Sequence, residues 1–339
     1  MKFSSGWKLN WRSIMKNNNA TGITVEQVQN YSEKIITEIE KAVIGKREIL
    51  QKLLAVFLSS GGHVLIEDYP GLAKTLIANS FATSLGLQFR RIQFTPDLMP
   101  GDITGGYIFD RDQNKFILRE GPIFANILLA DEINRASPKT QSALLEAMQE
   151  HQVTLEGDTL GLPYPFIVVA TQNPIEYEGT FPLPEAQLDR FMVKLRMGYP
   201  KPEEEQEILE RRLQRKDDAV SLSPVVTPEI FSEMRRLVED VYVDPDVQRY
   251  IVDLVTKIRN HRQVVIGASP RGSLALVKLT RAWAAIQGRN YVVPDDIKRF
   301  AQDTLGHRLI LEPSLWGSKT TADTVIDEVI QSIEVPVTP

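Results

Sequence analysis

Short apolar runs alternate with helical patterns between about Gly61 and Gly198. The strand candidates are His63–Glu67, Phe89–Phe94, Ala125–Ala130 and Phe166–Ala170. Near-continuous apolar runs separated by helices are typical of a parallel sheet that helices cover on both faces. We therefore predict an α/β fold with a parallel sheet flanked by helices.

Two helices are predicted between these strands. Lys74–Leu85 follows the first strand and is closed by Gly86. The other begins with Ser137 as N-cap and Pro138 at the first helical position, which both residue types favour. Its apolar residues recur on one face, at Leu144, Leu145 and Met148.

Two segments interrupt the alternation. Tyr107–Leu118 and Gln152–Leu162 each suggest two short strands around a polar turn. We predict that both are hairpins projecting from the sheet as insertions.

The pattern changes after Tyr199, where helical periods replace strand signals. Thr227-Pro228 and Ser269-Pro270 open two predicted helices, and Asp246–Arg259 is a third. A chain of 339 residues exceeds what one hydrophobic core usually serves. The expected division is a basic N-terminal tail (1–20), an α/β core (21–198) and a smaller all-helical lid domain (199–339).

The N-terminal tail, Met1–Ala20, contains four basic residues and no acidic one. Its apolar residues recur at helical spacing, so it could contact an anionic membrane surface; the favoured alternative is a disordered tail. The whole chain has a net charge of -5, which gives no strong signal for nucleic-acid binding. It has no cysteine, which excludes disulfides and thiol catalysis and fits a cytoplasmic protein.

The first chemical motif is Asp68-Tyr69-Pro70-Gly71-Leu72-Ala73-Lys74-Thr75, between a strand and a helix. Such a loop surrounds phosphates with backbone N–H groups, while the lysine reaches the β- and γ-phosphates and the threonine binds Mg²⁺. A strict motif has glycine at positions 68 and 73. Alanine at 73 suits the loop only if its φ is negative, and a plain strand–turn–helix is the alternative.

The second motif is the apolar strand that ends in Asp131 and Glu132. Ligand chemistry gathers at the carboxyl ends of parallel strands. Asp131 would hold Mg²⁺, and Glu132 would act as general base toward the attacking water. The alternative is a buried strand capped by solvated acids.

Residues 130–150, ADEINRASPKTQSALLEAMQE, resemble the signature run of MoxR-type AAA+ ATPases, and the resemblance extends over about residues 25–330. It implies that Asn173 orients the water or contacts the γ-phosphate, that Arg190 is an arginine finger and that Arg271 is sensor 2. A turn at Asn173, a surface ion pair of Arg190 with Asp189 or Glu185, and a solvated Arg271 are the alternatives. Gln93–Asp102 also resembles the family pattern, without roles for individual residues.

The resemblance also implies a nucleotide-binding set and partners. The expected contacts to ATP are Ile44, Gly45, Pro70, Gly71, Leu72, Ala73, Lys74, Thr75, Leu76 and Asp131, with Thr75 and Asp131 as the Mg²⁺ ligands. The implied function is Mg²⁺-dependent ATP hydrolysis in a ring, usually a hexamer, with a chaperone-like role toward a protein client and a von Willebrand A-type partner.

Three rival functions remain open on the sequence. They are a nucleic-acid remodeller, a nucleotide-gated scaffold with little turnover, and a chelatase-type subunit that inserts a metal.

Overall fold

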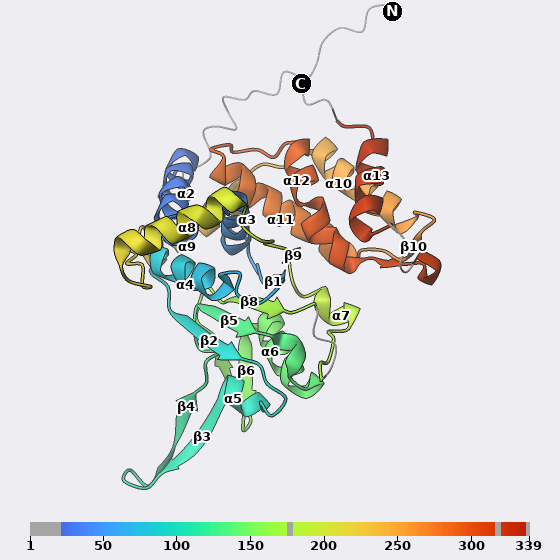
Figure 1. Ribbon diagram of the computed structural model, residues 1–339. Helices are drawn as coiled ribbons and strands as arrows, with labels where there is room; N and C mark the ends of the chain where they lie inside the picture. Colours follow the sequence, from blue (N-terminus) through green and yellow to red (C-terminus); the bar gives the residue numbers. More distant parts are fainter. Residues whose placement is uncertain (1–21, 175–178, 316–319, 337–339) are drawn as a thin grey trace, which may run out of the picture.

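The central element is a parallel sheet of five strands in the order β2-β5-β8-β1-β9 (Figure 1). The computed structural model describes residues 22–174, 179–315 and 320–336. Four strands lie where the apolar runs predicted them, and the fifth is β9. Their bounds are β1 Val64–Glu67, β2 Phe89–Gln93, β5 Ile127–Asp131, β8 Ile167–Gln172 and β9 Val193–Leu195. The predicted α/β fold is confirmed.

Successive residues of β1, β5 and β8 contribute to different hydrophobic clusters. Leu65, Leu128 and Val168 belong to one cluster, and their chain neighbours such as Ile66 and Leu129 belong to the other. This alternation follows from the two-residue period of a strand. Both faces are apolar, because helices cover the sheet on both sides.

Different helices serve the two faces. The cluster that contains Ile66 and Leu129 takes residues from α2 Val25–Ile39, α3 Arg47–Leu58 and α4 Lys74–Ser84, and from the C-terminal helices described below. The other takes residues from the short α5, Pro100–Thr104, and from α6, Pro138–Glu150. The side chain of Ser137 accepts a hydrogen bond from the backbone of Thr140, so the predicted N-cap of α6 is confirmed.

Both predicted hairpins are present. One joins β3 Gly105–Asp110 to β4 Lys115–Glu120, and the other joins β6 Gln152–Leu155 to β7 Asp158–Gly161. The β3–β4 hairpin extends away from the rest of the molecule at the lower left of Figure 1. The two hairpins are joined by a hydrogen bond of 2.9 Å from the Tyr107 hydroxyl to Asp158 Oδ2.

Helices dominate the chain beyond residue 199. They are α8 Pro202–Arg215, α9 Pro228–Asp240, α10 Pro245–Arg259, α11 Pro270–Ile286, α12 Pro294–Leu305 and α13 Ala322–Ser332, with a four-residue helix α7, Glu185–Leu188, before them. The same region also contains a short antiparallel pair that the sequence pattern did not predict. Its strands are β10 Val264–Ile266 and β11 Ile310–Leu311.

The C-terminal helices α9–α13 share one hydrophobic cluster with α2, α3 and the sheet. Phe231, Leu254 and Leu279 are fully buried in this cluster. Helix α8 differs from them, since none of its residues is buried. The C-terminal helices are thus held by packing, whereas α8 must be positioned by contacts of another kind.

The expectation for the N-terminal tail falls on residues 1–20, which lie outside the described part of the chain. Within the described ranges, no helix is both long and apolar enough to cross a membrane.

Candidate functional site

A cavity of about 410 Å³ lies at the carboxyl ends of β1, β5 and β8. It is lined by the whole loop Pro70–Thr75 together with Leu76, and by Asp131, Glu132 and Asn173. Three segments far apart in sequence meet there, because the carboxyl ends of neighbouring parallel strands lie at one edge. The structure therefore brings together most of the residues expected to contact the nucleotide.

The loop between β1 and α4 has two residues in the left-handed region. Gly71 has φ 82°, which costs glycine nothing, and Ala73 has φ 55°. The sequence expectation was that alanine would need a negative φ at position 73, and that expectation is wrong. A left-handed alanine costs roughly 1 kcal/mol, because its Cβ approaches the following carbonyl.

Lys74 is the first residue of α4, and its ammonium group lies within the loop. Its Nζ donates a hydrogen bond of 2.7 Å to the carbonyl oxygen of Asp68. Burial lowers the pKa of Lys74, while the carboxylates of Asp131, Asp68 and Glu132 act in the opposite direction. A cation on the floor of a cavity beside backbone N–H groups is the arrangement that binds phosphate oxygens.

Asp131 ends β5, and hydrogen bonds orient both of its carboxylate oxygens. Oδ1 accepts from the Thr171 hydroxyl at 2.6 Å, and Oδ2 accepts from Arg91 Nη2 at 2.7 Å. Thr75 lines the same cavity from α4. A hydroxyl and a carboxylate are oxygen ligands of the kind that Mg²⁺ takes alongside phosphates and water, so these residues fit the ion.

Glu132 follows in a left-handed conformation, with φ 56°. A glutamate rarely takes this conformation, and such strain is concentrated at functional sites. Its Oε2 accepts a hydrogen bond of 2.6 Å from Gln93 Nε2 and lies 3.2 Å from Arg135 Nε. The turn therefore aims the carboxylate into the cavity, where two donors hold it.

Arg91 is a site residue that the sequence reasoning missed, and Gln93 was part of a family pattern without a role of its own. Both come from β2, where Gln93 is paired with Asp131 in the parallel register. The detectable signal was the polar character of β2, in which Arg90, Arg91 and Gln93 are polar and only Phe89 and Ile92 are apolar. Without the strand order, however, no pattern in the sequence places β2 beside β5.

The described residues that line this cavity do not include Ile44 and Gly45. Gly45 lies instead against Glu204 of α8: a Cβ added at Gly45 would be 2.1 Å from the Glu204 Cδ. Their expected contact with the base of a nucleotide stays a prediction.

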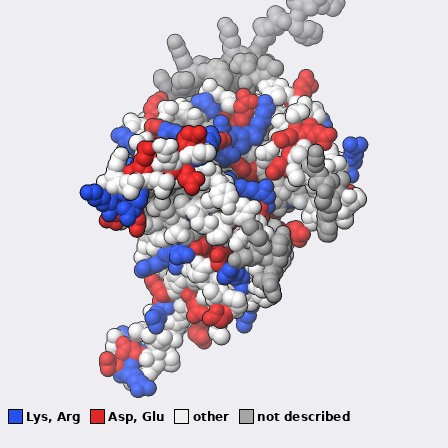
Figure 2. All heavy atoms as spheres, viewed as in Figure 1, with Lys and Arg blue, Asp and Glu red and all other residues white. Residues whose placement is uncertain are grey.

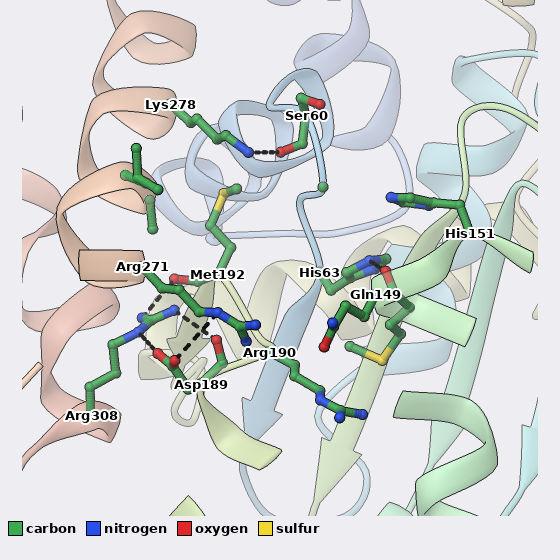
Figure 3. A pocket seen from close by; sticks show the side chains of 14 residues that line it. Ser60, His63, Gln149, His151, Asp189, Arg190, Met192, Arg271, Lys278 and Arg308 are labelled. Atoms are coloured by element: carbon green, nitrogen blue, oxygen red, sulfur yellow. Dashed lines mark hydrogen bonds and ion pairs between the residues drawn. The ribbon is translucent and has the colours of Figure 1, made fainter. Parts of the chain in front are cut away.

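Arg190 and Arg271 line a different pocket, of about 310 Å³ (Figure 3). Its wall includes His63, the residue before β1, whereas the loop cavity follows the last residue of β1. A strand of four residues spans roughly 13 Å. Arg190 and Arg271 thus line one pocket, which lies at the opposite end of β1 from Lys74.

Asp189 organises this arginine pocket. Its Oδ1 accepts a hydrogen bond of 2.7 Å from Arg308 Nε, and its Oδ2 lies 4.0 Å from Arg271 Nε. Burial lowers the pKa of Arg308, and Asp189 opposes that shift. Arg190 takes no part in this cluster and points away from it in Figure 3. No carboxylate in the described residues lies within ion-pair distance of Arg190, which disfavours the surface-salt-bridge alternative.

His63 forms the buried floor of the arginine pocket. Its Nδ1 accepts from the backbone N–H of Val168, and its Nε2 contacts the carbonyl oxygen of Met148, both at 3.0 Å. Burial is the main cause that lowers the pKa of His63 to about 3. The ring is therefore neutral at pH 7, and its role is to join β1, β8 and α6.

Two family models match the chain. Residues 63–193 match the "ATPase family associated with various cellular activities (AAA)", and residues 256–329 match the "AAA lid domain".

Individual proteins are similar over most of their length. "Chaperone MoxR1" of Mycobacterium tuberculosis is 41% identical over 90% of this chain and 82% of that protein. "Protein MoxR" of Methylorubrum extorquens is 29% identical over 81% of this chain and 86% of that protein. The crystal structure of a candidate ATPase from Cytophaga hutchinsonii superposes with a TM-score of 0.87 and 38% identity, covering 92% of this chain and 97% of that one.

Proposed function

The chain belongs to the MoxR family of AAA+ ATPases, and on that premise we propose that it hydrolyses ATP to ADP and phosphate with Mg²⁺. The observation that supports this most strongly is the single cavity shared by Lys74, Asp131, Glu132 and Asn173. A phosphate-binding loop, an acidic strand end and a polar side chain from the next strand are the parts that phosphoryl transfer to water requires.

In this proposal the loop binds the phosphates through its backbone N–H groups, and Lys74 contacts the β- and γ-phosphates. The Thr75 hydroxyl and the Asp131 carboxylate would hold Mg²⁺, which supplies positive charge to the phosphate oxygens. Arg91 fixes the orientation of Asp131 through its 2.7 Å contact. Positioning and electrostatics thus account for catalysis, and no covalent step on the protein is needed.

Glu132 would take the proton from the attacking water, and Asn173 would orient that water. Gln93 and Arg135 both contact Glu132 Oε2, and the carboxylate still has acceptor positions for the proton of a water molecule. The two donors therefore position the base.

We further propose that Arg190 and Arg271 act on the nucleotide of a neighbouring copy. Both line the pocket at the amino end of β1, while the phosphate loop lies at the carboxyl end. A site completed by a neighbour requires a head-to-tail interface, and such interfaces close into rings. The expected hexamer is part of this proposal.

The work driven by hydrolysis is proposed to be chaperone-like. This rests on the family and on the relative named a chaperone. The β3–β4 hairpin exposes Phe109 and Phe116, whose rings contact each other with centroids 5.3 Å apart. We propose that this apolar end contacts the client, with a von Willebrand A-type protein as the partner that the resemblance implies. We also propose a cytoplasmic location.

Nucleic-acid remodelling is the less favoured alternative. Both basic and acidic side chains lie at the end of the β3–β4 hairpin (Figure 2). The turn and the strand residues beside it include Arg111 and Lys115 as well as Asp110 and Asp112. Such a mixed surface does not provide the excess of cations that phosphate backbones attract.

The test is ATP hydrolysis measured against protein concentration, with Mg²⁺, for the parent chain and for Glu132→Gln. We expect turnover per chain to rise with concentration and to fall about 10²-fold or more in the variant, because the general base is lost. The exposed Glu146→Gln on α6 is the matched control. ATP binding without turnover in the parent would instead indicate a nucleotide-gated scaffold.

A further inference from the structure

Helix α8 connects the sheet to the C-terminal helices, and packing does not explain its position. It has 14 residues, none of them buried. Leu209 and Leu213 are 61% and 74% exposed. An isolated helix of this length is marginal in water, so contacts at its ends must fix its position. At its C-terminal half, Arg211 Nη1 donates a hydrogen bond of 2.8 Å to the carbonyl oxygen of Glu40.

The N-terminal end of α8 is held by two charged side chains that bond to the backbone of residues 197–199. Asp68 Oδ2 accepts from the N–H groups of Met197 and Gly198, each at 2.7 Å. Lys46 Nζ donates to the carbonyl oxygens of Met197, Gly198 and Tyr199 at 2.9, 3.1 and 3.0 Å. A segment without a partner strand thereby has its backbone groups satisfied by one carboxylate and one ammonium group. We call these contacts the linker clamp.

The linker clamp starts inside the phosphate loop. Asp68 stands where a strict phosphate loop has glycine, and it is only 5% exposed. Its Oδ1 accepts from the N–H of Tyr69 at 2.9 Å, and its carbonyl accepts from Lys74. The ring of Tyr69 also stacks on that of Tyr199, with centroids 5.7 Å apart. The loop and the linker therefore contact each other in two ways. The Asp68 carboxylate accepts from backbone N–H groups of the linker, and the Tyr69 ring stacks on Tyr199.

The adjacent acid, Glu67, does not take part in the linker clamp. Its carboxylate bonds to the side chains of Lys194 and Arg196, from β9 and the residue after it. Two consecutive acids thus have separate tasks: Glu67 fixes the edge strand, and Asp68 fixes the chain that leaves it. This contrast supplies a control.

We propose that Asp68 and Lys46 are positioning residues that tie α8 to the phosphate loop, so that a change in the loop on nucleotide binding moves α8. This inference rests on the proposed function, because it assumes that the loop binds a nucleotide. The physical reason is geometric: Lys74 and the linker are bonded to one residue, through its carbonyl and its carboxylate. Charge-assisted hydrogen bonds of this length are roughly twice as strong as neutral ones, which favours a joint movement of the loop and the linker.

The test measures the distance between α8 and α6, a helix that packs on the sheet. The chain has no cysteine, so Gln214→Cys on α8 and Glu146→Cys on α6, both exposed, provide two sites for spin labels. Labelled chains are mixed with a large excess of unlabelled chain, which leaves only distances within one copy. Distance distributions are recorded by double electron–electron resonance without nucleotide and with ATP.

Without nucleotide, we expect a narrow distribution in the parent and a broad one in Asp68→Gly, which restores the glycine of the strict motif. Asp68→Asn keeps an acceptor oxygen and should give an intermediate width, and Lys46→Met should also broaden it. Glu67→Gln should leave the width unchanged. Parent-like widths in both Asp68→Gly and Lys46→Met would overturn the clamp.

With ATP, the distribution should shift in the parent and not in Asp68→Gly. In Asp68→Gly we also expect kcat to fall about tenfold, with the Kd for ATP changed less than about threefold. If Asp68→Gly lowered Tm but left kcat and the ATP-dependent change in distance as in the parent, Asp68 would have only a structural role. That result would overturn the proposed coupling between the loop and α8. Failure of the parent to bind ATP contradicts the proposed function, whereas the nucleotide-free widths decide the clamp by themselves.

Discussion

The pockets at the two ends of β1 differ in their charged side chains. At its carboxyl end, the loop cavity holds Asp131 and Glu132 with two cations, Lys74 and Arg91, and Arg91 is already paired with Asp131. At its amino end, the arginine pocket holds Arg190, Arg271, Arg308 and Lys278, with only Asp189 as a carboxylate in its lining. The first suits a metal–phosphate group, and the second suits the negative charge that develops on a phosphate. In the proposed function, one copy presents both halves and a neighbouring copy joins them.

The largest expected effect breaks this comparison at the amino end. Arg190→Ala should lower kcat about 10³-fold, the range for removing an arginine that stabilises charge in phosphoryl transfer. The proposal assigns the two halves to different copies, so mixing Arg190→Ala with Glu132→Gln should restore part of the activity. Phosphate release measured over mixing ratios tests this. Mixtures no more active than their parts would place both residues in the site of one copy.

The next effect concerns the stability of the arginine pocket. Asp189→Ala removes the partner of Arg308, which is 8% exposed, and leaves a buried cation unpaired. We expect a loss of about 3 kcal/mol in the free energy of unfolding, measured with urea. Glu185→Ala, an exposed acid on α7, is the control and should change little. Equal effects in the two variants would contradict the role given to Asp189.

A pH titration sharpens the comparison at the buried floor of the same pocket. The folded-state pKa of His63 is about 3, below its ordinary 6.5, so folding favours the neutral ring. Its contribution to stability is complete above pH 6.5 and is lost as the pH falls toward 3. From pH 7 to pH 5 this amounts to about 2 kcal/mol. Urea unfolding at both pH values checks it, and His63→Gln should reduce the difference.

The smallest effect lies in the loop cavity. Ala73→Gly removes a left-handed alanine, and the gain is partly offset by the greater freedom of glycine in the unfolded chain. We expect a net gain of about 0.5 kcal/mol, visible as a Tm higher by about 1 °C. Asn114→Gly, at a φ of 49°, is the control and should gain less, because asparagine tolerates this conformation. A lower Tm in Ala73→Gly would show that the loop does not store this strain.

The sequence by itself determined the parallel sheet and the residues that follow the carboxyl ends of its strands. Apolar runs separated by helices predicted four of the five strands, and Lys74, Asp131 and Asn173 all follow such runs. Their meeting in one cavity was predictable, because parallel strands place their carboxyl ends at a common edge. Strand β9 escaped prediction, since three residues with a central lysine have no recognisable period.

Only the tertiary structure decided how distant segments meet. It placed Gln93 beside Glu132, Arg271 beside Asp189, and the Asp68 carboxylate on the backbone of Met197. It also decided the positive φ of Ala73. Local periodicity records which side of an element is buried, but strand order, helix docking and backbone strain arise from the packing of the whole chain. For that reason the residues of the phosphate loop could be named from the sequence, whereas the contacts that tie this loop to α8 could not.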